Sequence, residues 1–563
     1  MAKFEWLPNE ILLESFKYLD DVQLFCAYYS LNFRFDTLLS IHFQSYHFDF
    51  RSISKQKFHL ICQQHLPYII EQVKSLYLSN DDETPNLPEI FYSYNFTLNK
   101  FSYLQYLSID SIHCLSTLNR ITFECRTIPY LTHLYLIKCD FKDQTKFSSL
   151  IENIWNLSKL ILCQIDHRFP YELKFTNNSI ISSTIKYLFV ENFQFNSDDL
   201  RNLFQSTPSL EQFHASIIQH NEYEQFHINS SSICSLNISF RKPFDSMLNF
   251  FKNFSNLNRL TIKTHYLYLN GNEWKKIIKN YLSKLEIFQL KMDLKFSHPK
   301  HIEEQLNELL NSFRTSFWIK EHQWFVQCDW FLLGITNYAV LYTLPYVFQE
   351  FILTNKQWSK STLIDNDQYQ IYDHITNLII MNVGTIPYFR NVQHLKINLP
   401  LTNHFWSSIR SFDRLISLEI IFFQGCFSIP LQILLDQSPR LHSLCFGNFS
   451  DLEILTKLTS KSIVRLDFLK KNTYKKYFTN TQCSLLIRSP LGYQCKNLLI
   501  YLENRMNIIQ LIKNMNNLQS IICQCKDDKL NDEFVQWLHR HLPSTYSISR
   551  DLNQLSNIRI WID

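Results

Sequence analysis

The sequence of 563 residues predicts an α/β solenoid with a short helical module in front of it and an insertion within it. Three observations predict this fold class. A hydrophobic motif recurs through much of the chain, the recurrence stops between residues 296 and 374, and residues 1–45 have the spacing of short amphipathic helices. A chain of this length is too long for one compact core, whereas in a repeat array each unit packs only on its neighbours.

The recurring motif has the form apolar-x-x-apolar-x-apolar, and Leu131-Thr132-His133-Leu134-Tyr135-Leu136 is a complete example. Successive copies begin 31, 27, 26, 28, 25, 23, 24 and 28 residues apart. This is the period of leucine-rich repeats, in which each unit is a short strand with a helical or irregular return. The first positions are Val73, Leu104, Leu131, Leu157, Ile185, Leu210, Ile233, Leu257 and Leu285. We therefore expect a first array over residues 70–295.

A second array is expected over residues 375–535, followed by a C-terminal cap over residues 536–563. Its motifs are spaced less evenly, with one step of 17 residues and one of 32. The Asn or Cys that follows the strand in many leucine-rich repeats is mostly absent, and Cys139 in the first array is the clearest case. The first positions are Ile375, Val392, Leu415, Leu441, Ile463, Cys495 and Leu518. The pattern predicts degenerate repeats.

Residues 296–374 break the repeat and predict an insertion that links the two arrays of a horseshoe. A helical stripe comes first, and an alternating aromatic run from Phe317 to Trp330 then favours a strand. The stretch Trp330 to Gln349 is uncharged and about long enough to span a bilayer. Because it contains Gly334, Pro345 and several other polar or breaking residues, we interpret it as a buried segment of a soluble protein. The helical stripe consists of Ile302, Leu306, Leu309, Leu310 and Phe313.

Residues 1–45 have the pattern of three short helices. Pro8 suits the first turn of a helix, and Glu10 complements the positive end of its dipole. Apolar residues then recur at helical spacing from Ile11 to Leu19, and Asp20-Asp21 can cap a second helix. The segment from Asn32 to Leu39 is predicted to form the third helix. Helices this short bury too little surface to be stable alone, so we expect them to pack on the rest of the chain or on a partner. Residues 46–69 are predicted to form a helical linker.

Leu7-Pro8-Asn9-Glu10-Ile11 and Tyr18-Leu19 resemble the LPxEI…YL opening of the F-box family. The resemblance implies that the module binds a Skp-type adaptor and, through it, a cullin-RING ubiquitin ligase. Many F-boxes carry Val-Cys-x-x-Trp in the third helix, where this chain has residues 29–34 as Tyr-Ser-Leu-Asn-Phe-Arg. The resemblance assigns adaptor contacts to Leu7, Pro8, Glu10, Ile11, Leu12, Phe16, Leu19, Leu24, Leu31 and Phe35. The layout as a whole is similar to expanded F-box families of small invertebrates. The alternative is an amphipathic bundle that only caps the next domain.

The repeats place function on the concave face of the solenoid, between the apolar positions of each strand. The residues there mix aromatic, charged and small polar side chains, as protein-binding surfaces do. We expect this face to bind a target protein, through Tyr106, Asp110, His133, Tyr135, Tyr187, Phe189, Glu191, Arg259 and Lys263.

The composition argues against several other classes of protein. With 6 glycines the chain has no phosphate loop, dinucleotide fingerprint or Gly-x-Ser-x-Gly elbow, and it has no His-Glu-x-x-His. Cys523-Gln524-Cys525 with His539-Arg540-His541 fits no zinc spacing, and Cys523 is better interpreted as a strand core position. We therefore expect no enzyme activity, metal or cofactor.

The charge and cysteine patterns bear on partners and location. A net charge of +4 without a strongly basic tract argues against nucleic acid. The 14 scattered cysteines and an N-terminus without a signal-peptide core favour reduced thiols in the cytoplasm or nucleus. The favoured function is the substrate receptor of a Skp–cullin–F-box ubiquitin ligase. The alternative is a leucine-rich-repeat scaffold that is not coupled to ubiquitination.

Overall fold

The structure is a computed structural model in which the described residues form two compact units. The first comprises residues 1–216 with Asp563, and the second residues 217–562. The described residues are 4–16, 18–19, 24, 27–29, 31–42, 46–140, 143–172, 181–216, 232–240, 244–296, 301–333, 336–354, 356–363, 371–381, 389–399, 412–422, 428–447, 453–470, 475–551 and 554–563.

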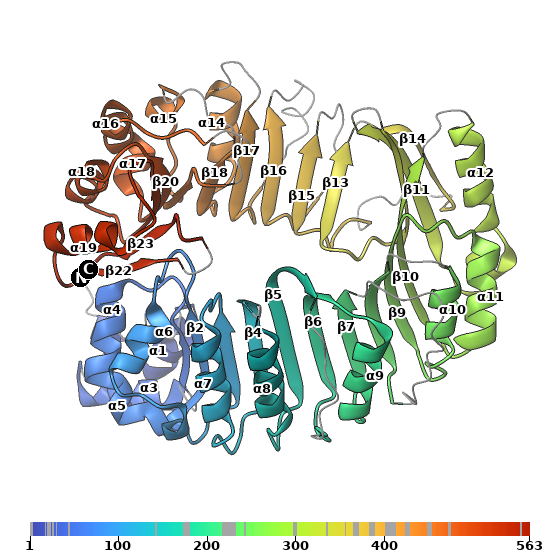
Figure 1. Cartoon of the computed structure of the whole chain (residues 1–563), viewed down its shortest axis with the longest axis horizontal. Coiled ribbons are helices and arrows are strands. Elements are labelled where there is room, and N and C mark those ends of the chain that lie inside the picture. Colours follow the sequence, from blue (N-terminus) through green and yellow to red (C-terminus); the bar gives the residue numbers. More distant parts are fainter. Residues whose placement is uncertain are drawn as a thin grey trace. The chain divides into compact units, whose positions relative to one another are not determined.

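The first unit begins with a small helical module (Figure 1). It contains the short turn η1 (Phe4–Trp6), helix α1 (Asn9–Phe16) and helix α3 (Phe33–His42). Between the two helices, Leu24 and residues 27–28 also have helical backbone. The rings of Phe16 and Phe35 both pack on the Tyr28 ring, with centroids 5.2 Å from it in both cases. This aromatic core joins the two helices.

The module is followed in the first unit by a parallel sheet whose strands pair in chain order (Figure 1). The strands are β1 (Tyr46–Asp49), β2 (Val73–Ser79), β3 (Tyr106–Asp110), β4 (His133–Cys139), β5 (Leu162–Glu172), β6 (Tyr187–Gln194) and β7 (Gln212–Ser216). The returns contain α4 (Lys55–Leu60), η2 (Ile61–His65), α5 (Leu66–Ile69), η3 (Ile70–Gln72), α6 (Leu87–Ser93), η4 (Leu98–Lys100), α7 (Leu115–Cys125), α8 (Gln144–Trp155) and α9 (Ser197–Ser206). Strand β1 lies in the range expected as a helical linker, and it pairs in parallel with β2. The array therefore starts before residue 70.

The predicted repeat register matches the strands of the first unit except at Leu157. Strands β3, β4, β6 and β7 each begin two residues after a predicted first position. Strand β5, however, pairs Cys163 with Leu134 and Ile165 with Leu136, which makes Leu160 the first position. Leu157 and Leu160 are three residues apart, so the motif fits the sequence in two registers. The observed register is the one that buries Cys163 and Ile165 and leaves Leu162 half-buried on the opposite face.

The second unit contains a sheet in which the strand direction changes. Strands β8 (Ser235–Phe240), β9 (Arg259–His265) and β10 (Ile287–Phe296) are parallel, and β12 (Thr336–Leu344), β11 (Phe325–Leu333) and β14 (Lys356–Ser361) then follow antiparallel to their neighbours. The helices are α10 (Phe244–Phe251), α11 (Gly271–Tyr281), α12 (Ile302–Ser312) and η5 (Phe317–Glu321). The predicted helical stripe is α12. The predicted aromatic strand is confirmed only in part, because residues 325–330 lie in β11 whereas Phe317–Glu321 forms the helical element η5. The uncharged stretch forms parts of β11 and β12, and no helix in the described part of the chain has the length and apolar character to cross a membrane.

The second sheet of this unit returns to parallel order. Its parallel strands are β13 (Glu350–Thr354), β15 (Asn377–Met381), β16 (His394–Leu399), β17 (Ser417–Phe422), β18 (Ser443–Phe446), β19 (Arg465–Asp467), β20 (Asn497–Leu502) and β21 (Ser520–Cys525). The sheet closes with an antiparallel pair, β23 (Ile558–Trp561) and β22 (Ser547–Arg550). The helices are α14 (Ser428–Asp436), α15 (Glu453–Lys457), α16 (Asn480–Arg488), α17 (Pro490–Gln494), α18 (Met506–Asn514) and α19 (Asp532–His541). Strand β13 adds a repeat, Phe348-x-x-Phe351-x-Leu353, within the range expected as an insertion.

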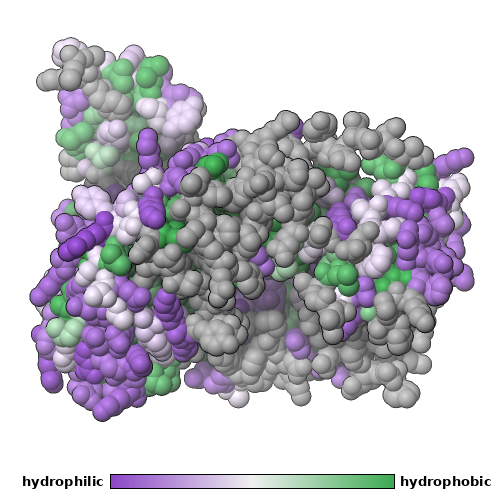
Figure 2. Space-filling view, turned by 90° about the horizontal axis from the view of Figure 1, so that it is seen from above, coloured by the Kyte–Doolittle hydropathy of each residue, from purple (hydrophilic) through white to green (hydrophobic). Residues whose placement is uncertain are grey.

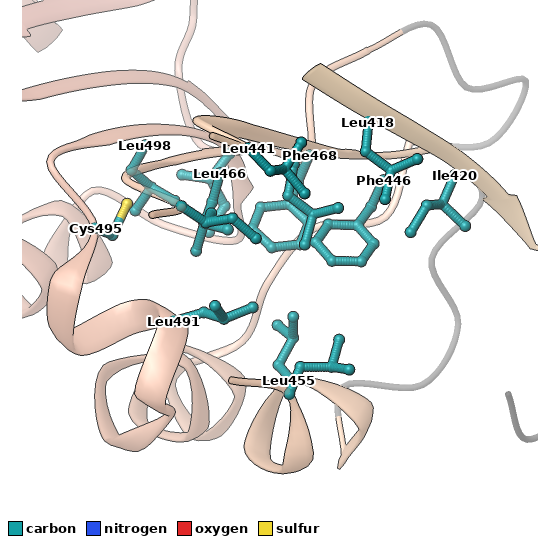
Figure 3. Packing of buried hydrophobic residues seen from close by; sticks show 14 of the residues in the cluster. Leu418, Ile420, Leu441, Phe446, Leu455, Leu466, Phe468, Leu491, Cys495 and Leu498 are labelled. Carbon is teal, nitrogen blue, oxygen red and sulfur yellow. The ribbon is translucent and has the colours of Figure 1, made fainter. Parts of the chain in front are cut away.

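The motif positions form the core of each repeat. Figure 3 shows Leu418 and Ile420 of β17 and Leu466 of β19 in one apolar layer with side chains from the returning helices, such as Leu455 of α15. Phe446 and Phe468 stack at 5.1 Å between their centroids, so equivalent side chains of successive repeats touch. Burial of each large apolar side chain contributes roughly 1.5–3 kcal/mol. Sequential parallel strands with this periodic core make the architecture an α/β solenoid of the leucine-rich-repeat type.

Candidate protein-binding surfaces

Large exposed apolar side chains are concentrated in the sequence of the N-terminal module. Six of them lie between Trp6 and Phe33, whereas the others are spread along the chain. A concentration of exposed apolar side chains marks an interaction surface, because water disfavours it. The six, which we call the module surface, are Trp6 (73% exposed), Ile11 (53%), Tyr18 (82%), Leu19 (39%), Leu31 (53%) and Phe33 (87%).

Arg34 ties the segment that carries this surface to helix α3. Its guanidinium donates to the backbone carbonyl of Glu5, to that of Leu7 at 2.5 Å, and to Asn9 Oδ1 at 2.9 Å. Arg34 lies in the part of the sequence that departs from the F-box pattern. It therefore fixes the chain on which Trp6, Leu7 and Pro8 stand, beside the beginning of α3.

The structure divides the ten predicted adaptor contacts into two groups. Leu12, Phe16, Leu24 and Phe35 are 0–1% exposed. They hold the module together, and as it stands their side chains cannot reach a partner, which corrects their assignment as contacts. The module also packs on its own chain, since the Tyr29 ring meets His65 of η2 edge-on at 4.7 Å. The accessible group consists of Leu7, Pro8, Glu10, Ile11, Leu19 and Leu31.

The second predicted surface lies on the open face of the first unit's sheet, defined as the strand side chains that alternate with the buried motif positions. Tyr106 and His133 are directly paired across β3 and β4, and their rings stack at 4.3 Å. Tyr187, further along the same row, is also half-buried. Ser108, Tyr135 and Phe189 stand in the next row of the sheet. The structure thus places the seven predicted residues of this unit's strands β3, β4 and β6 with their side chains on one face.

Partial burial keeps this aromatic surface uncharged at neutral pH. It lowers the pKa of His133, whose Nδ1 lies 2.8 Å from Thr132 Oγ1. It also raises the pKa of Tyr135, with Tyr77 and Tyr106 adding to the effect. Aromatic side chains of this kind offer large contact areas and lose little conformational entropy on binding.

An acidic edge borders the aromatic rows. Asp110 ends strand β3, Glu191 follows the aromatic positions of β6, and Asp166 of β5 is paired with Glu191. Burial raises the pKa of Asp166 to about 6, and the charge of Glu191 adds to that rise. Asn192 Nδ2 donates to Asp166 Oδ1 at 2.9 Å and offsets part of the effect. The surface therefore combines apolar rings with a negative rim.

The prediction missed residues that the repeat period could have located. Tyr77 and His214 stand four residues after Val73 and Leu210, the same offset as Tyr135 has from Leu131. In the structure Arg51 lies 5.0 Å from the centre of the Tyr77 ring, and His214 meets Phe189 edge-on at 5.9 Å.

A second missed feature is an aromatic ladder that precedes the motifs. Tyr103 and Tyr130 stack at 5.7 Å, and Lys159 Nζ lies 4.3 Å from the centre of the Tyr130 ring. Each of the three immediately precedes a first position once Leu160 replaces Leu157. The ladder therefore supports the corrected register.

The remaining predicted contacts, Arg259 and Lys263, belong to the second unit. Arg259 begins β9 and is exposed, whereas the Lys263 ammonium lies 5.3 Å from the centre of the Phe348 ring. Figure 2 shows one side of the molecule, where hydrophilic residues dominate the described surface and hydrophobic ones occur singly or in small groups.

The described residues do not gather three or more His, Cys, Asp or Glu side chains in a metal-binding arrangement. Cys523 is fully buried in β21, as predicted for a strand core position. Cys139 is also buried, and its thiol donates to Ile109 O and Ile137 O at 3.8 and 3.5 Å. It satisfies backbone carbonyls where β4 ends, and burial raises its pKa well above the usual range.

No family model matches the chain, and no curated protein matches it. Among solved structures, the chain is similar to the TLR13–ssRNA13 complex with 14% identity and a TM-score of 0.25, covering 76% of this chain and 64% of that one. It is also similar to the plant peptide hormone receptor RGFR1 in complex with RGF2, with 12% identity and a TM-score of 0.19, covering 84% of this chain and 93% of that one. The chain thus spans less than two thirds of the TLR13 chain. At these scores the solenoid assignment rests on the chain's own strand register.

Proposed function

We propose that the protein is the substrate receptor of a Skp–cullin–F-box ubiquitin ligase. Its N-terminal module binds a Skp-type adaptor, and the open face of its repeats binds a target protein. The place of action is the cytoplasm or the nucleus. The observation that carries the proposal is the exposed apolar module surface, which includes Ile11, Tyr18 and Leu19 of the F-box-like sequence.

The accessible contacts suit an adaptor groove. Ile11 and Leu31 each leave about half of their surface exposed, and Leu19 adds a third aliphatic side chain. Arg34 fixes the backbone beside them, so less conformational entropy is lost on binding. Glu10 in the first turn of α1 supplies a charge at the edge of the contact.

The open face of the first unit supplies the target side. Its central residues are tyrosine, histidine and phenylalanine, and its edge is acidic through Asp110 and Glu191. Aromatic anchors at the centre of an interface contribute most of the binding free energy, while a charged rim steers the encounter. A target with a basic, partly apolar surface fits this combination.

The mechanism requires no catalytic group in this chain. A receptor that holds target and ligase together raises the effective concentration of target lysines near the ubiquitin carrier. The rate of target ubiquitination therefore depends on the receptor's affinity for the adaptor and on its affinity for the target.

The adaptor contact is tested by calorimetry of the full chain with a purified Skp-type adaptor. Replacing both Ile11 and Leu31 with Ala removes two exposed aliphatic contacts, and we expect the dissociation constant to rise about 10–100-fold. Leu555→Ala is the matched control, since Leu555 is also 53% exposed but lies outside the module. We expect it to bind as the unaltered chain does.

If the unaltered chain does not bind the adaptor at micromolar concentrations, the ligase function is wrong. The protein would then be a leucine-rich-repeat interaction scaffold that is not coupled to ubiquitination. The contact of Tyr29 with His65 is the observation that favours this second function, because it makes the module a cap on its own chain.

A further inference from the structure

Three neighbouring parallel strands of the second unit bring a serine, a histidine and an aspartate into line. His265 on β9 places Nε2 3.1 Å from Ser239 Oγ on β8. Its other ring nitrogen, Nδ1, lies 2.8 Å from Asp293 Oδ2 on β10. A nucleophile within hydrogen-bonding distance of a base, itself oriented by an acid, is the arrangement of serine hydrolases.

The strand register explains why these side chains meet. His265 and Asp293 are direct partners across β9 and β10, and Ser239 is paired with Lys263, two residues before His265 on the same face. The neighbouring positions Thr264 and Met292 are fully buried, which holds both strand ends in place. This geometry needs no Gly-x-Ser-x-Gly elbow, the signal whose absence argued against a hydrolase.

The chain bends sharply directly after the histidine. Tyr266 has a positive φ of 60°, and its N–H donates to the carbonyl oxygen of Asp293 at 2.7 Å. A left-handed backbone is costly for a bulky residue, and the hydrogen bond to Asp293 offsets part of that cost. The bend ends β9 at His265 and locks that end to β10.

The charges around Asp293 favour its ionised form. Burial alone would raise the pKa of Asp293, but the hydrogen bond from His265 and the charges of Lys291 and Lys263 lower it. Asp293 is therefore a carboxylate at neutral pH and accepts the proton of His265 Nδ1. The lone pair of Nε2 is then directed at the Ser239 hydroxyl.

We propose that Ser239, His265 and Asp293 form an acyl-transfer site for esters that carry a carboxylate on the acyl group. The Ser239 oxygen bonds to the ester carbonyl carbon while its proton passes to His265 Nε2. The bond from carbon to the leaving oxygen then breaks, and that oxygen takes the proton. Water next attacks the acyl carbon, gives a proton to Nε2 and releases the acid, and Ser239 regains its proton.

Two lysines near the site determine which class of substrate it favours. Lys263 of β9 is paired with Ser239 of β8 and, on its other side, with Lys291 of β10. Both ammonium groups are within 6 Å of aromatic rings, of Phe348 at 5.3 Å and of Tyr346 at 5.9 Å. Their positive charges favour an anionic acyl group and the oxyanion that forms during attack. His265 and Asp293 are 25% and 27% exposed, so a small ester can reach them.

The test uses the purified full chain with 4-nitrophenyl hemisuccinate and, for comparison, 4-nitrophenyl acetate. We expect a burst of nitrophenolate and a succinyl adduct on Ser239 in the peptide map. Ser239→Ala should abolish both, and His265→Gln should slow acylation by roughly 100-fold or more. Ser235→Ala is the control on the same strand and should behave as the unaltered chain does. Lys263→Ala combined with Lys291→Ala should remove the preference for the hemisuccinate.

Asp293 is a positioning residue, so its variant needs a readout that misfolding would not mimic. We expect Asp293→Asn to lower kcat roughly tenfold or more while KM changes little, with an unchanged urea midpoint. The proposal is overturned if the unaltered chain shows no burst, if Ser239→Ala retains it, or if the adduct forms elsewhere. None of these outcomes bears on adaptor binding, which the calorimetric test decides separately.

Discussion

Asp166 shows how one side chain on the open face makes stability depend on pH. Burial and the neighbouring charge of Glu191 raise its pKa to about 6, whereas an unfolded aspartate titrates near 4. Between these values the folded chain binds more protons than the unfolded chain. Stability therefore falls as pH rises through this window, and the full penalty is present above about pH 6.

Asp166→Asn should remove this dependence, because the amide cannot ionise and its oxygen can still accept from Asn192. The unaltered chain should lose unfolding free energy when the pH rises from about 4 to about 6.5. We expect this loss to be about 1–2 kcal/mol smaller in the variant, a value that includes a reduction for solvent screening. Urea unfolding at both pH values measures it. Asp110→Asn, a half-exposed carboxylate on β3, is the control. Equal pH dependence in Asp166→Asn and the unaltered chain would contradict the expectation.

The sequence located most open-face residues because strand alternation and the repeat period together fix which side chains share a face. Tyr106, His133 and Tyr187 were found this way, and Tyr77 and His214 could have been. Burial within the helical module was harder to foresee. Leu12 and Ile11 are adjacent on an amphipathic helix, and only tertiary packing decides that Leu12 is buried and Ile11 exposed. The Ser239–His265–Asp293 line was also hidden, since it depends on the register between three strands.

At the scale of elements, helix α11 begins in close contact with the end of α12. A Cβ on Gly271 would lie 2.4 Å from the backbone oxygen of Ser312 in α12. The Gly271 N–H donates to Ser312 Oγ at 2.6 Å, and the Gly271 carbonyl accepts from the Trp318 indole at 3.2 Å. The absence of a side chain is what lets the two helices meet.

Gly271→Ala should therefore destabilise the protein, although Gly to Ala usually stabilises a helix. The added methyl group must push α11 from α12, and we expect a loss of about 1–3 kcal/mol in unfolding free energy by urea titration. Asn272→Ala, the exposed next residue of the helix, should change it by less than about 0.5 kcal/mol. A neutral or stabilising Gly271→Ala would show that the helices separate freely.

Arg34 controls a second element, the segment that leads into α1. Its replacement by Ala removes hydrogen bonds to the Glu5 and Leu7 carbonyls and to Asn9. We expect faster amide hydrogen exchange in residues 5–16, by about tenfold, because charge-assisted hydrogen bonds of partly exposed groups contribute roughly 1–2 kcal/mol. Exchange in β3 and β4 is the internal control. Unchanged protection of residues 5–16 would mean that apolar packing alone holds the segment.

At the scale of the whole molecule, periodicity predicted the repeat strands well and the insertion less well. The spacing of apolar residues determines where a parallel strand begins, because every repeat buries its side chains at the same three motif positions. Strand β13 escaped detection since its motif uses Phe348 and Phe351 and follows directly on the antiparallel strands. Strand β1 escaped because its four residues are too few to show a period. The change of strand direction after β10 depends on long-range pairing that no local pattern encodes.

The proposed connector makes a prediction about the protein as a whole, namely that its two surfaces bind independently. The module surface and the aromatic rows consist of different residues, so a change on one should leave partners of the other in place. Affinity purification from the native cells with quantitative mass spectrometry measures this. We expect the Ile11→Ala and Leu31→Ala double variant to lose adaptor and cullin but to keep target proteins. The Tyr106→Ala and Tyr187→Ala double variant should keep the adaptor and lose targets about tenfold or more, since truncated aromatic anchors typically cost over 1 kcal/mol each. Loss of the same set of proteins from both variants would contradict separate surfaces and would favour a single interface.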